Sequence, residues 1–299
     1  MARKETLHLG TLTVASKNKL TKFRGVTARY IVDTADGQGG GTAFKNPVPT
    51  GREVTIDLNL LSTISSAGEC IGRNLDVTTW SVTNLAATAY DFIGDWESGS
   101  ITVQNELGDG RGGTQEWKEN QIQSSSYTVK GTLLLPKDSV TGAQTLFKEA
   151  INQANLAWGT GCAIAHHTFS LSLVFSGSTF TAGAGTFLLT EAAIIAEVGA
   201  FLLIEVTFES RGEPAAATFH AEATGTTDTL RELAFETNSS SVATFVMETA
   251  ATASANADLN LTGTSMLIES YACNWSKGQI TEEKMVLRSV SNNVAVAFA

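Results

Sequence analysis

The stretch YTVKGT at residues 127–132 indicates the fold class, because polar and apolar side chains alternate along it. This period of two is typical of a strand that buries one face. After it come TLFKEA at 145–150, which suits a short helix, and GTFLLTE at 185–191, which suits another strand. The same order returns in TFHAEA at 218–223, TLRELA at 229–234 and GTSMLIE at 263–269. This repeated order predicts two copies of one structural unit. Such units form stacks or rings, because each presents the same edge to its neighbour.

Further alternating runs rich in Val, Ile, Thr and Phe predict strands over most of the chain. They lie at residues 7–14, 26–32, 54–60, 101–103, 127–135, 168–175, 201–208 and 284–290. Apolar stripes at 143–157 and 227–236 predict two helices, each covering a sheet face or an open end of a sandwich. We therefore predict an all-β fold, a β-sandwich or barrel module with one packed α-helix, plus a second partial copy of it.

Domain organisation follows from length and from the positions of these elements. The chain has 299 residues, about two domains at roughly 150 residues each. We predict a module at 76–212 and a second, partial module at 213–299 that has too few strands to close alone. Residues 1–75 hold strands and a long loop, and one option left open is that they complete the C-terminal module. Long loops at 33–53 and 108–120 are expected to carry function, since connections of that length are uncommon in compact folds.

The net charge of the chain and its distribution indicate which classes of partner to expect. Lys and Arg number 20 against 30 Asp and Glu, a net charge of −10. An acidic chain is a poor candidate for tight nucleic-acid binding, but it suits a wall that DNA passes without adhering. Residues 1–30 are an exception, with seven Lys or Arg and one acid. This region is either a solvated face or a basic edge that meets an acidic face of another copy. The candidates for such inter-subunit contacts are Lys17, Lys19, Lys22 and Arg24.

Three cysteines, widely spaced at 70, 162 and 273, predict neither a disulfide framework nor a zinc site. No apolar run reaches about 18 residues, so no membrane span is expected. The first residues lack the apolar core of a secretory signal, so none is expected there.

The sequence holds no motif that meets the requirements of a catalytic or metal site. The glycines at 37–41 lack the strand, helix and Lys-Ser/Thr of a phosphate loop. His166 and His167 are neighbours in a predicted strand and point to opposite faces, which disfavours a shared metal. Cys162 lies near this histidine pair, as a nucleophile and base would, but the sequence indicates neither a lowered thiol pKa nor a third orienting group, so a core cysteine is expected. We expect no catalytic residue, no metal and no cofactor, and we rank an enzyme last among the alternatives.

The order of several segments resembles the major tail proteins, or tail tube proteins, of tailed bacteriophages. An opening strand pair, YDFIGDWESGSITV at 90–103, is followed by a polar loop at 106–121. The strand SSSYTVKGTL at 124–133, the helix segment LFKEA at 146–150, the strand at 185–191 and a closing strand at 204–212 come next. The likeness is an order of elements and is best over residues 77–212.

This resemblance implies a self-assembling structural protein of the virion, made in the host cytoplasm. Rings of six or pseudo-six modules, built from three or six chains, would stack into a hollow tube that conducts DNA. The implied partners are the chain itself, other tail proteins and DNA in transit, with no membrane. The implied inter-ring loop residues are Leu107, Asp109, Arg111, Thr114, Glu116, Trp117, Lys118 and Glu119. The acids expected to face the lumen are Glu97, Glu106, Glu205 and Glu209, of which the last two share one face of a strand.

Two other classes stay open. One is a different virion component, such as a capsid decoration, tail terminator or baseplate protein. The other is a carbohydrate-binding β-sandwich, which needs exposed aromatic side chains on one face. Trp96 and Trp117 flank the loop at 108–120 and suit either anchors between protein copies or stacking platforms.

Overall fold

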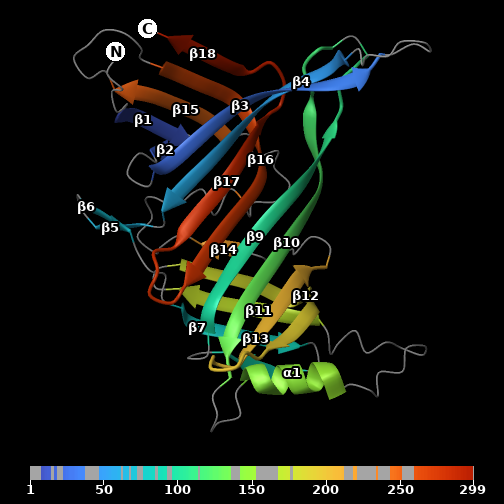
Figure 1. Cartoon of the computed structure of the whole chain (residues 1–299), viewed down its shortest axis with the longest axis vertical. Helices are drawn as coiled ribbons and strands as arrows, with labels where there is room; N and C mark the ends of the chain where they lie inside the picture. Colours follow the sequence, from blue (N-terminus) through green and yellow to red (C-terminus); the bar gives the residue numbers. More distant parts are fainter. Residues whose placement is uncertain are drawn as a thin grey trace.

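The computed structural model shows an elongated, almost entirely β-stranded chain (Figure 1). The residues that it describes are 8–14, 17–18, 23–37, 47–61, 63–66, 69–72, 77–84, 87–92, 96–113, 115–135, 142–152, 168–175, 178–211, 218–220, 234, 243–250 and 259–298. Among them, no helix is long and apolar enough to cross a membrane.

Eighteen strands and one helix make up the described secondary structure. The strands are β1 (His8–Val14), β2 (Lys17–Asn18), β3 (Phe23–Asp36), β4 (Pro47–Leu61), β5 (Thr63–Ser66), β6 (Glu69–Gly72), β7 (Val77–Asn84), β8 (Ala89–Asp91), β9 (Trp96–Asp109), β10 (Asn120–Leu134), β11 (Thr168–Phe175), β12 (Ser178–Ile195), β13 (Leu203–Ser210), β14 (Thr218–His220), β15 (Ala243–Ala250), β16 (Leu259–Ser276), β17 (Glu282–Ser289) and β18 (Val294–Phe298). The helix is α1 (Gly142–Asn152).

Sixteen strands join into one antiparallel sheet, which confirms the all-β prediction. Its main path runs β2-β1-β15-β16-β9-β10-β13-β12-β11-β7-β8. β17 and β18 also pair with β16, β4 pairs with β17, β3 with β4, and β14 with β12. β1 and β4, from the first 75 residues, thus pair with β15 and β17 from the last 87. The domain boundaries drawn from the sequence stay a prediction.

The lower end of the sheet curls over itself (Figure 1). Buried aromatic side chains pack inside it. β7 is separated from β10 along the sheet by β13, β12 and β11, yet a Cβ atom at Gly131 of β10 would overlap the ring of Trp80 of β7. Gly99 lies opposite Gly131 and in the same way leaves space for Trp275 of β16. The two indoles meet edge to face with centroids 5.9 Å apart. Two glycines on neighbouring strands therefore let two buried tryptophans approach the backbone closely.

The helix α1 confirms the first predicted helix, although it begins at Gly142 and its described part ends at Asn152 rather than 157. It buries Ala143 and Leu146, and its first residue lies so close to Asp91 of β8 that a side chain would not fit at Gly142. The second predicted helix, 227–236, lies outside the described residues except for Ala234, which is helical and buried. The predicted duplication of the unit therefore stays a prediction.

Two of the predicted loops are shorter than expected because strands continue into them. β3 extends to Asp36 and β4 begins at Pro47, so residues 33–36 and 47–53 of the predicted loop form a two-stranded ribbon. β9 continues to Asp109 and β10 begins at Asn120. Residues 110–119 connect these strands and are called the β9–β10 tip below; its described residues, all but Thr114, lie outside the two strands.

Candidate functional site: the polar sheet face and the Glu53 cluster

One face of the sheet is the core and the opposite face is polar. On β9, Ile101 and Val103 are fully buried, so Ser100, Thr102 and Gln104 point the other way. Cross-strand register carries this alternation to β10, β13 and β16. We call the result the polar sheet face. Its members are Ser98, Ser100, Thr102, Gln104 and Glu106 on β9, Ser124, Ser126, Thr128, Lys130 and Thr132 on β10, Glu205, Thr207 and Glu209 on β13, and Ser270, Ala272, Asn274 and Ser276 on β16.

The same register extends this face over three more strands. Met285 and Leu287 of β17 are buried, so Lys284 and Arg288 lie on the polar side. On β4, Asn59 pairs with Lys284 and Thr55 with Arg288, and Asp57 lies between them on the same side. On β3, Thr27 pairs with Asp57 and Arg29 with Thr55. Seven neighbouring strands, from β3 to β13, thus share one polar surface and one apolar surface.

Acids outnumber cations on the β9–β13 part of the polar sheet face. Glu106, Glu205 and Glu209 are exposed there, and Lys130 is the cation. Neutral hydroxyls and amides make up the rest, and Ser124 donates a hydrogen bond to Glu106 at 2.9 Å. The surface is therefore weakly anionic and carries short, neutral hydrogen-bonding groups between its charges.

The structure brings three of the four predicted lumen acids to this face. Glu97 is different, because it lies at the irregularity where β9 shifts register against β10, and it is half-buried. Its backbone carbonyl accepts a hydrogen bond from Lys277 at 2.8 Å. That any of these acids faces a lumen stays a prediction.

The predicted basic residues fall in different surroundings. Arg24 forms an ion pair with Glu282 of the same chain. Lys17 belongs to β2, but its side chain is outside the described part. Lys19 and Lys22 also lie outside the described residues. Their role between subunits stays a prediction.

The β9–β10 tip folds against β4 of its own chain. Arg52 donates its backbone N–H to the carbonyl of Glu116 at 3.1 Å, and Lys118 donates its own to the carbonyl of Arg52 at 3.0 Å. The side chains of Arg52 and Glu116 form an ion pair at 2.8 Å. Trp117 packs edge to face on Tyr30 of β3, with ring centroids 6.1 Å apart.

These contacts place most of the predicted inter-ring residues. Leu107 and Asp109 are in β9 rather than in a loop, and Arg111 forms an ion pair with Asp109 at 2.8 Å. Glu119 donates its backbone N–H to Asp109 at 3.2 Å. Thr114 lies outside the described residues. The tip is therefore held within its own chain, and its role between rings stays a prediction.

A cluster of charged groups fastens this tip to the polar side of the sheet. We call it the Glu53 cluster, comprising Glu53, Asp33, Lys118, Asn120, Glu269 and Arg288. Glu53 is only 3% exposed. One carboxylate oxygen accepts hydrogen bonds from Arg288 at 2.8 Å and from Lys118 at 3.2 Å, and the other accepts one from Asn120 at 3.2 Å.

The outer members of the cluster complete it. Arg288 donates from Nε and Nη2 to the two carboxylate oxygens of Glu269, at 2.7 and 2.6 Å. Lys118 reaches Asp33 at 2.6 Å. Such bidentate and charge-assisted hydrogen bonds are the strong ones, and together they tie β3, β4, β10, β16 and β17 to the tip.

The surroundings shift the pKa values of three members. Burial alone would raise the pKa of Glu53, but Arg288 and Lys118 outweigh it and hold that pKa below its ordinary value of 4.5. Burial alone would lower the pKa of Lys118, but its hydrogen bonds to Asp33 and Glu53 raise that pKa above its ordinary value of 10.5. Hydrogen bonds to Glu269 raise the pKa of Arg288 further. All three groups are charged at neutral pH.

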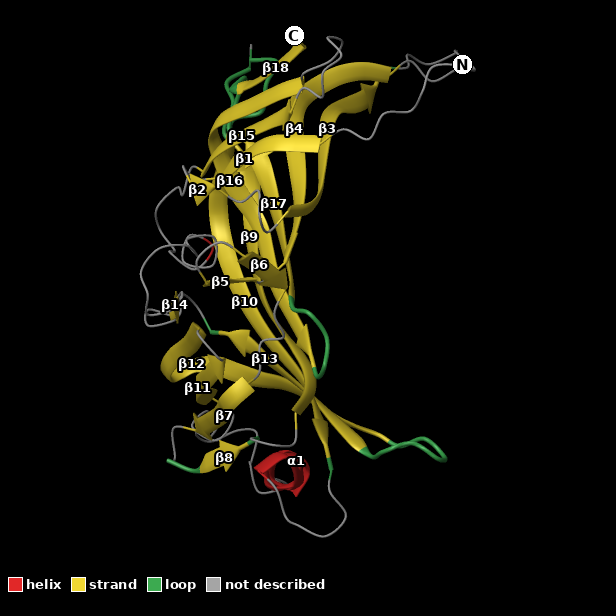
Figure 2. Ribbon diagram, turned by 90° about the vertical axis from the view of Figure 1, so that its left-hand side faces the viewer, coloured by secondary structure: helices red, strands yellow, loops and turns green. Residues whose placement is uncertain are grey.

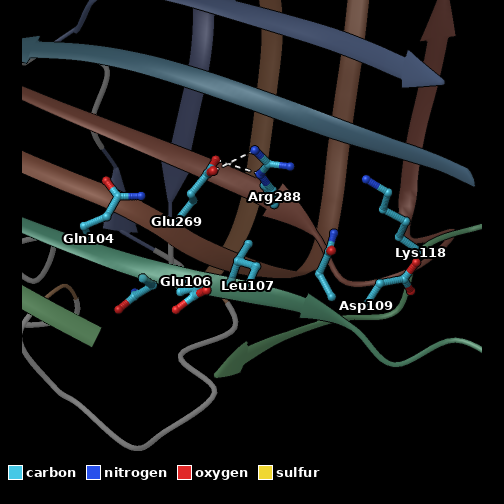
Figure 3. Close-up of a pocket in the computed structure, with 9 residues that line it drawn as sticks. Gln104, Glu106, Leu107, Asp109, Lys118, Glu269 and Arg288 are labelled. Carbon is cyan, nitrogen blue, oxygen red and sulfur yellow. Dashed lines mark hydrogen bonds and ion pairs between the residues drawn. The ribbon is translucent and has the colours of Figure 1, made fainter. Parts of the chain in front are cut away.

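A cavity of about 380 Å³ lies beside this cluster, and Figure 3 shows the side chains that line it. Arg288 and Glu269 point toward one another across it, while Glu106 and Gln104 lie along β9. Its buried Asn105 donates to the carbonyl of Ile268 at 2.7 Å and accepts from Ser125 at 2.6 Å. These polar lining groups thus form hydrogen bonds within the chain, and the arrangement suits a structural role that holds the β9–β10 tip to the sheet. Within the described ranges, no three His, Cys, Asp or Glu side chains are arranged to hold a metal ion.

Sequence reasoning missed Glu53, Glu269, Arg288 and Asn120. Glu53 and Arg288 are 235 positions apart, and neither belongs to a short motif. The one available signal was the alternation along residues 284–290, which places Arg288 opposite the buried Leu287.

Comparisons with known proteins give little beyond this geometry. No family model matches the chain, and no curated protein matches it. A chain in a solved structure described as "Virion of native gene transfer agent (GTA) particle" aligns with 48% of this chain and 95% of its own length. The two are 11% identical, with a TM-score of 0.31. A score at that level does not establish a shared fold.

Proposed function

We propose that this chain is a structural, non-enzymatic virion protein that assembles into stacked rings, forming a phage tail tube through which DNA passes. The observation that carries the proposal is the polar sheet face. It is one surface of a continuous sheet that is several strands wide, and on β4, β17, β16, β9, β10 and β13 the opposite surface is buried in the core. A sheet of this kind suits the wall of a water-filled tube.

The chemistry of that face fits the passage of DNA. Exposed Glu106, Glu205 and Glu209 repel phosphates, and between them the face offers hydroxyls and amides rather than a basic track. The exposed cations Lys130 and Lys284 lie three strands apart, on β10 and β17, and Arg24 and Arg29 are paired with acids of the same chain. They form no continuous basic track, whereas tight binding needs several phosphate contacts at once. In this role the face lines the lumen, and the core face points outward into the ring wall.

Unpaired edge strands allow neighbouring copies to join into a closed ring in the proposed assembly. Within the described part of the chain, β3 pairs with β4 on one side and with no strand on the other. At the far end of the main path, β8 pairs with β7 and with no other described strand. Unpaired edges invite pairing with another chain, and joining them around a ring removes them.

A specific observation favours a second candidate, a virion component that forms a single ring without stacking, such as a tail terminator. The β9–β10 tip, the segment expected to reach the next ring, packs on β4 of its own chain. The two candidate functions differ in whether the rings stack into tubes.

Electron microscopy of the purified full chain tests both. We expect rings with an open centre that stack into tubes at high protein concentration. Rings that never stack would support the second candidate, and a strictly monomeric protein would contradict both.

The lumen assignment has its own test. Glu205→Lys combined with Glu209→Lys should leave rings intact but make them retain DNA in a salt-sensitive way, measured by filter binding of labelled duplex. Asp36→Lys combined with Asp91→Lys is the matched control, because both acids are exposed and lie off the polar sheet face. Equal DNA retention by the two variants would remove the lumen assignment.

A further inference from the structure

The strand β4 changes neighbours along its length. From Thr55 to Leu61 it lies between β3 and β17, but β17 ends at Ser289, so residues 47–54 pair with β3 alone among the described strands. We call the side of residues 47–54 that faces away from β3 the upper β4 edge. Figure 2 shows β3 and β4 together at the end of the molecule that also carries β18. An edge of this kind offers main-chain N–H and C=O groups with which another chain can pair.

Groups of the same chain already bond to this edge. Val54 donates its N–H to the hydroxyl of Ser289 at 2.9 Å. Two residues earlier, Arg52 uses both its main-chain groups on the β9–β10 tip, through the carbonyl of Glu116 at 3.1 Å and the N–H of Lys118 at 3.0 Å. The tip therefore occupies the upper β4 edge as a short parallel strand would.

Side chains hold the tip in this position. Arg111 lies over Gly51, where an added Cβ atom would overlap its guanidinium. Further along the tip, the ammonium of Lys118 reaches the buried carboxylate of Glu53 at 3.2 Å. The tip is thus attached to β4 by packing and by charge as well as by two main-chain hydrogen bonds.

The sequence of this part of β4 is that of an edge strand. The chain has four prolines, and two of them, Pro47 and Pro49, lie here. Proline has no N–H to donate, so within sheets it is confined to edges, strand ends and bulges. Prolines and covering loops are two of the means by which β proteins prevent edge-to-edge pairing between chains.

We propose that the β9–β10 tip is an autoinhibitory segment, which occupies the upper β4 edge and so keeps an edge strand of a second copy of this chain from pairing there. A second copy is the favoured occupant because it brings unpaired edges of its own, those of β3 and β8 among the described strands. Trp117 of the tip reaches the 57% exposed Tyr30 from this edge, so a strand that replaced the tip would also cover apolar surface. The autoinhibition acts in the isolated subunit and does not depend on the proposed tail tube.

Reversing one charge tests this autoinhibition. Lys118→Glu places a carboxylate beside Glu53 and Asp33, so the tip should leave β4 and the Arg52 amide should exchange its hydrogen at least about 10-fold faster. Sedimentation velocity should then show self-association at least about 10-fold tighter than that of the unchanged chain. Lys277→Glu is the matched control, because Lys277 is exposed in the β16–β17 turn and the change in net charge is the same.

A second variant covers the case in which Lys118→Glu perturbs folding, as judged by circular dichroism. Glu116→Arg sets two cations side by side at Arg52 and leaves the Glu53 cluster intact, and the side chain of Glu116 is 68% exposed. It should open the tip in the same direction, with faster Arg52 exchange and tighter association. An Arg52 amide that exchanged as slowly in both variants as in the unchanged chain would overturn the proposal.

Arg52→Pro separates edge pairing from other effects of the charge reversal. The N–H of Arg52 points to the tip rather than to β3, so proline removes no β3–β4 hydrogen bond but denies that donor to any added strand. Combined with Lys118→Glu, it should return association to the level of the unchanged chain. Tighter association that persisted in this double variant, or an equal gain in Lys277→Glu, would overturn the autoinhibition.

The outcomes separate this proposal from the proposed function. Rings from the unchanged chain, with no gain in association when the tip is opened, would refute the autoinhibition and leave the proposed function standing. Tighter association of Lys118→Glu, reversed by Arg52→Pro, from a chain that never forms rings would support the autoinhibition and refute the proposed function.

Discussion

The two ends of the sheet are stabilised by different physical means. At the lower end, Trp80, Phe92 and Trp275 pack edge to face in a fully buried core. At the upper end, the β9–β10 tip is fastened by the Glu53 cluster, in which Arg288 and Lys118 share one buried carboxylate. The lower end is stabilised by close aromatic packing, and the upper end by ion pairs and charge-assisted hydrogen bonds.

This difference predicts different sensitivities. Aromatic packing depends on close contact and changes little with pH or salt. A cluster of carboxylates and cations needs its acids ionised, so it weakens as they are protonated. The aromatic end is therefore expected to form the permanent core of the subunit, and the charged end to respond to solution conditions.

Trp80→Ala is expected to cause the largest loss of stability, because it disrupts the aromatic core at the lower end of the sheet. Removing a fully buried indole costs about 3–5 kcal/mol of unfolding free energy, through lost apolar burial and the cavity left behind. Urea unfolding followed by circular dichroism measures it. Trp117→Ala is the control at the charged end, where the indole is half-buried, and it should cost about 1 kcal/mol. Equal losses would contradict the division between the two ends.

Gly131→Ala sharpens the same comparison with a smaller change. The added methyl would overlap the Trp80 ring, which is fully buried and packs against Phe92 and Trp275. We expect a loss of about 1–3 kcal/mol from overpacking, measured by the shift of the urea midpoint.

Gly112→Ala supplies the matched control for that substitution. No atom lies within 4 Å of a Cβ added at Gly112 in the β9–β10 tip. Its unfolding free energy should stay within about 0.5 kcal/mol of the unchanged chain. If both glycine variants lost the same stability, a general backbone effect of replacing glycine, rather than the Trp80 contact, would explain the loss.

Local pattern was enough to predict much of the fold and part of the site. Alternation alone assigned Ile101 and Val103 to one side of a strand, and it placed Glu205 and Glu209 together on one strand face, because side-chain direction in a strand is fixed by parity. The polar sheet face follows from such parities once the strands are paired in register.

The remaining features depend on contacts between distant segments, which parity does not encode. The approach of Trp80 to Gly131 requires the sheet to curl, and the meeting of Glu53 and Arg288 requires β4 to pair with β17. The long β16 changes partners near Ser265, whose positive φ of 61° is held in place by hydrogen bonds between Asn293 and the neighbouring backbone. A serine gives no sequence signal for such a conformation, since glycine or asparagine is the usual choice.

Glu53→Gln is expected to cause the smallest loss of stability among these substitutions, and it removes the central charge of the Glu53 cluster at the upper end of the sheet. The substitution keeps the shape of the side chain but removes the charge shared by Arg288 and Lys118, which retain Glu269 and Asp33 as partners. We expect a loss of about 1–2 kcal/mol at pH 7, measured by urea unfolding, since hydrogen bonds to charged groups contribute about that much.

The pH dependence of this loss gives its cause. The folded pKa of Glu53 lies below its ordinary value of 4.5, so its contribution to stability is present above pH 4.5 and is lost as the pH falls through the folded pKa. The difference between the unchanged chain and Glu53→Gln should therefore shrink in acid, where both carry a neutral side chain. Glu116→Gln, at an exposed ion pair with Arg52, should show almost no difference at either pH. A deficit in Glu53→Gln that stayed constant down to pH 3 would mean that the side chain acts through packing, and the contrast between a shape-held end and a charge-held end would no longer stand.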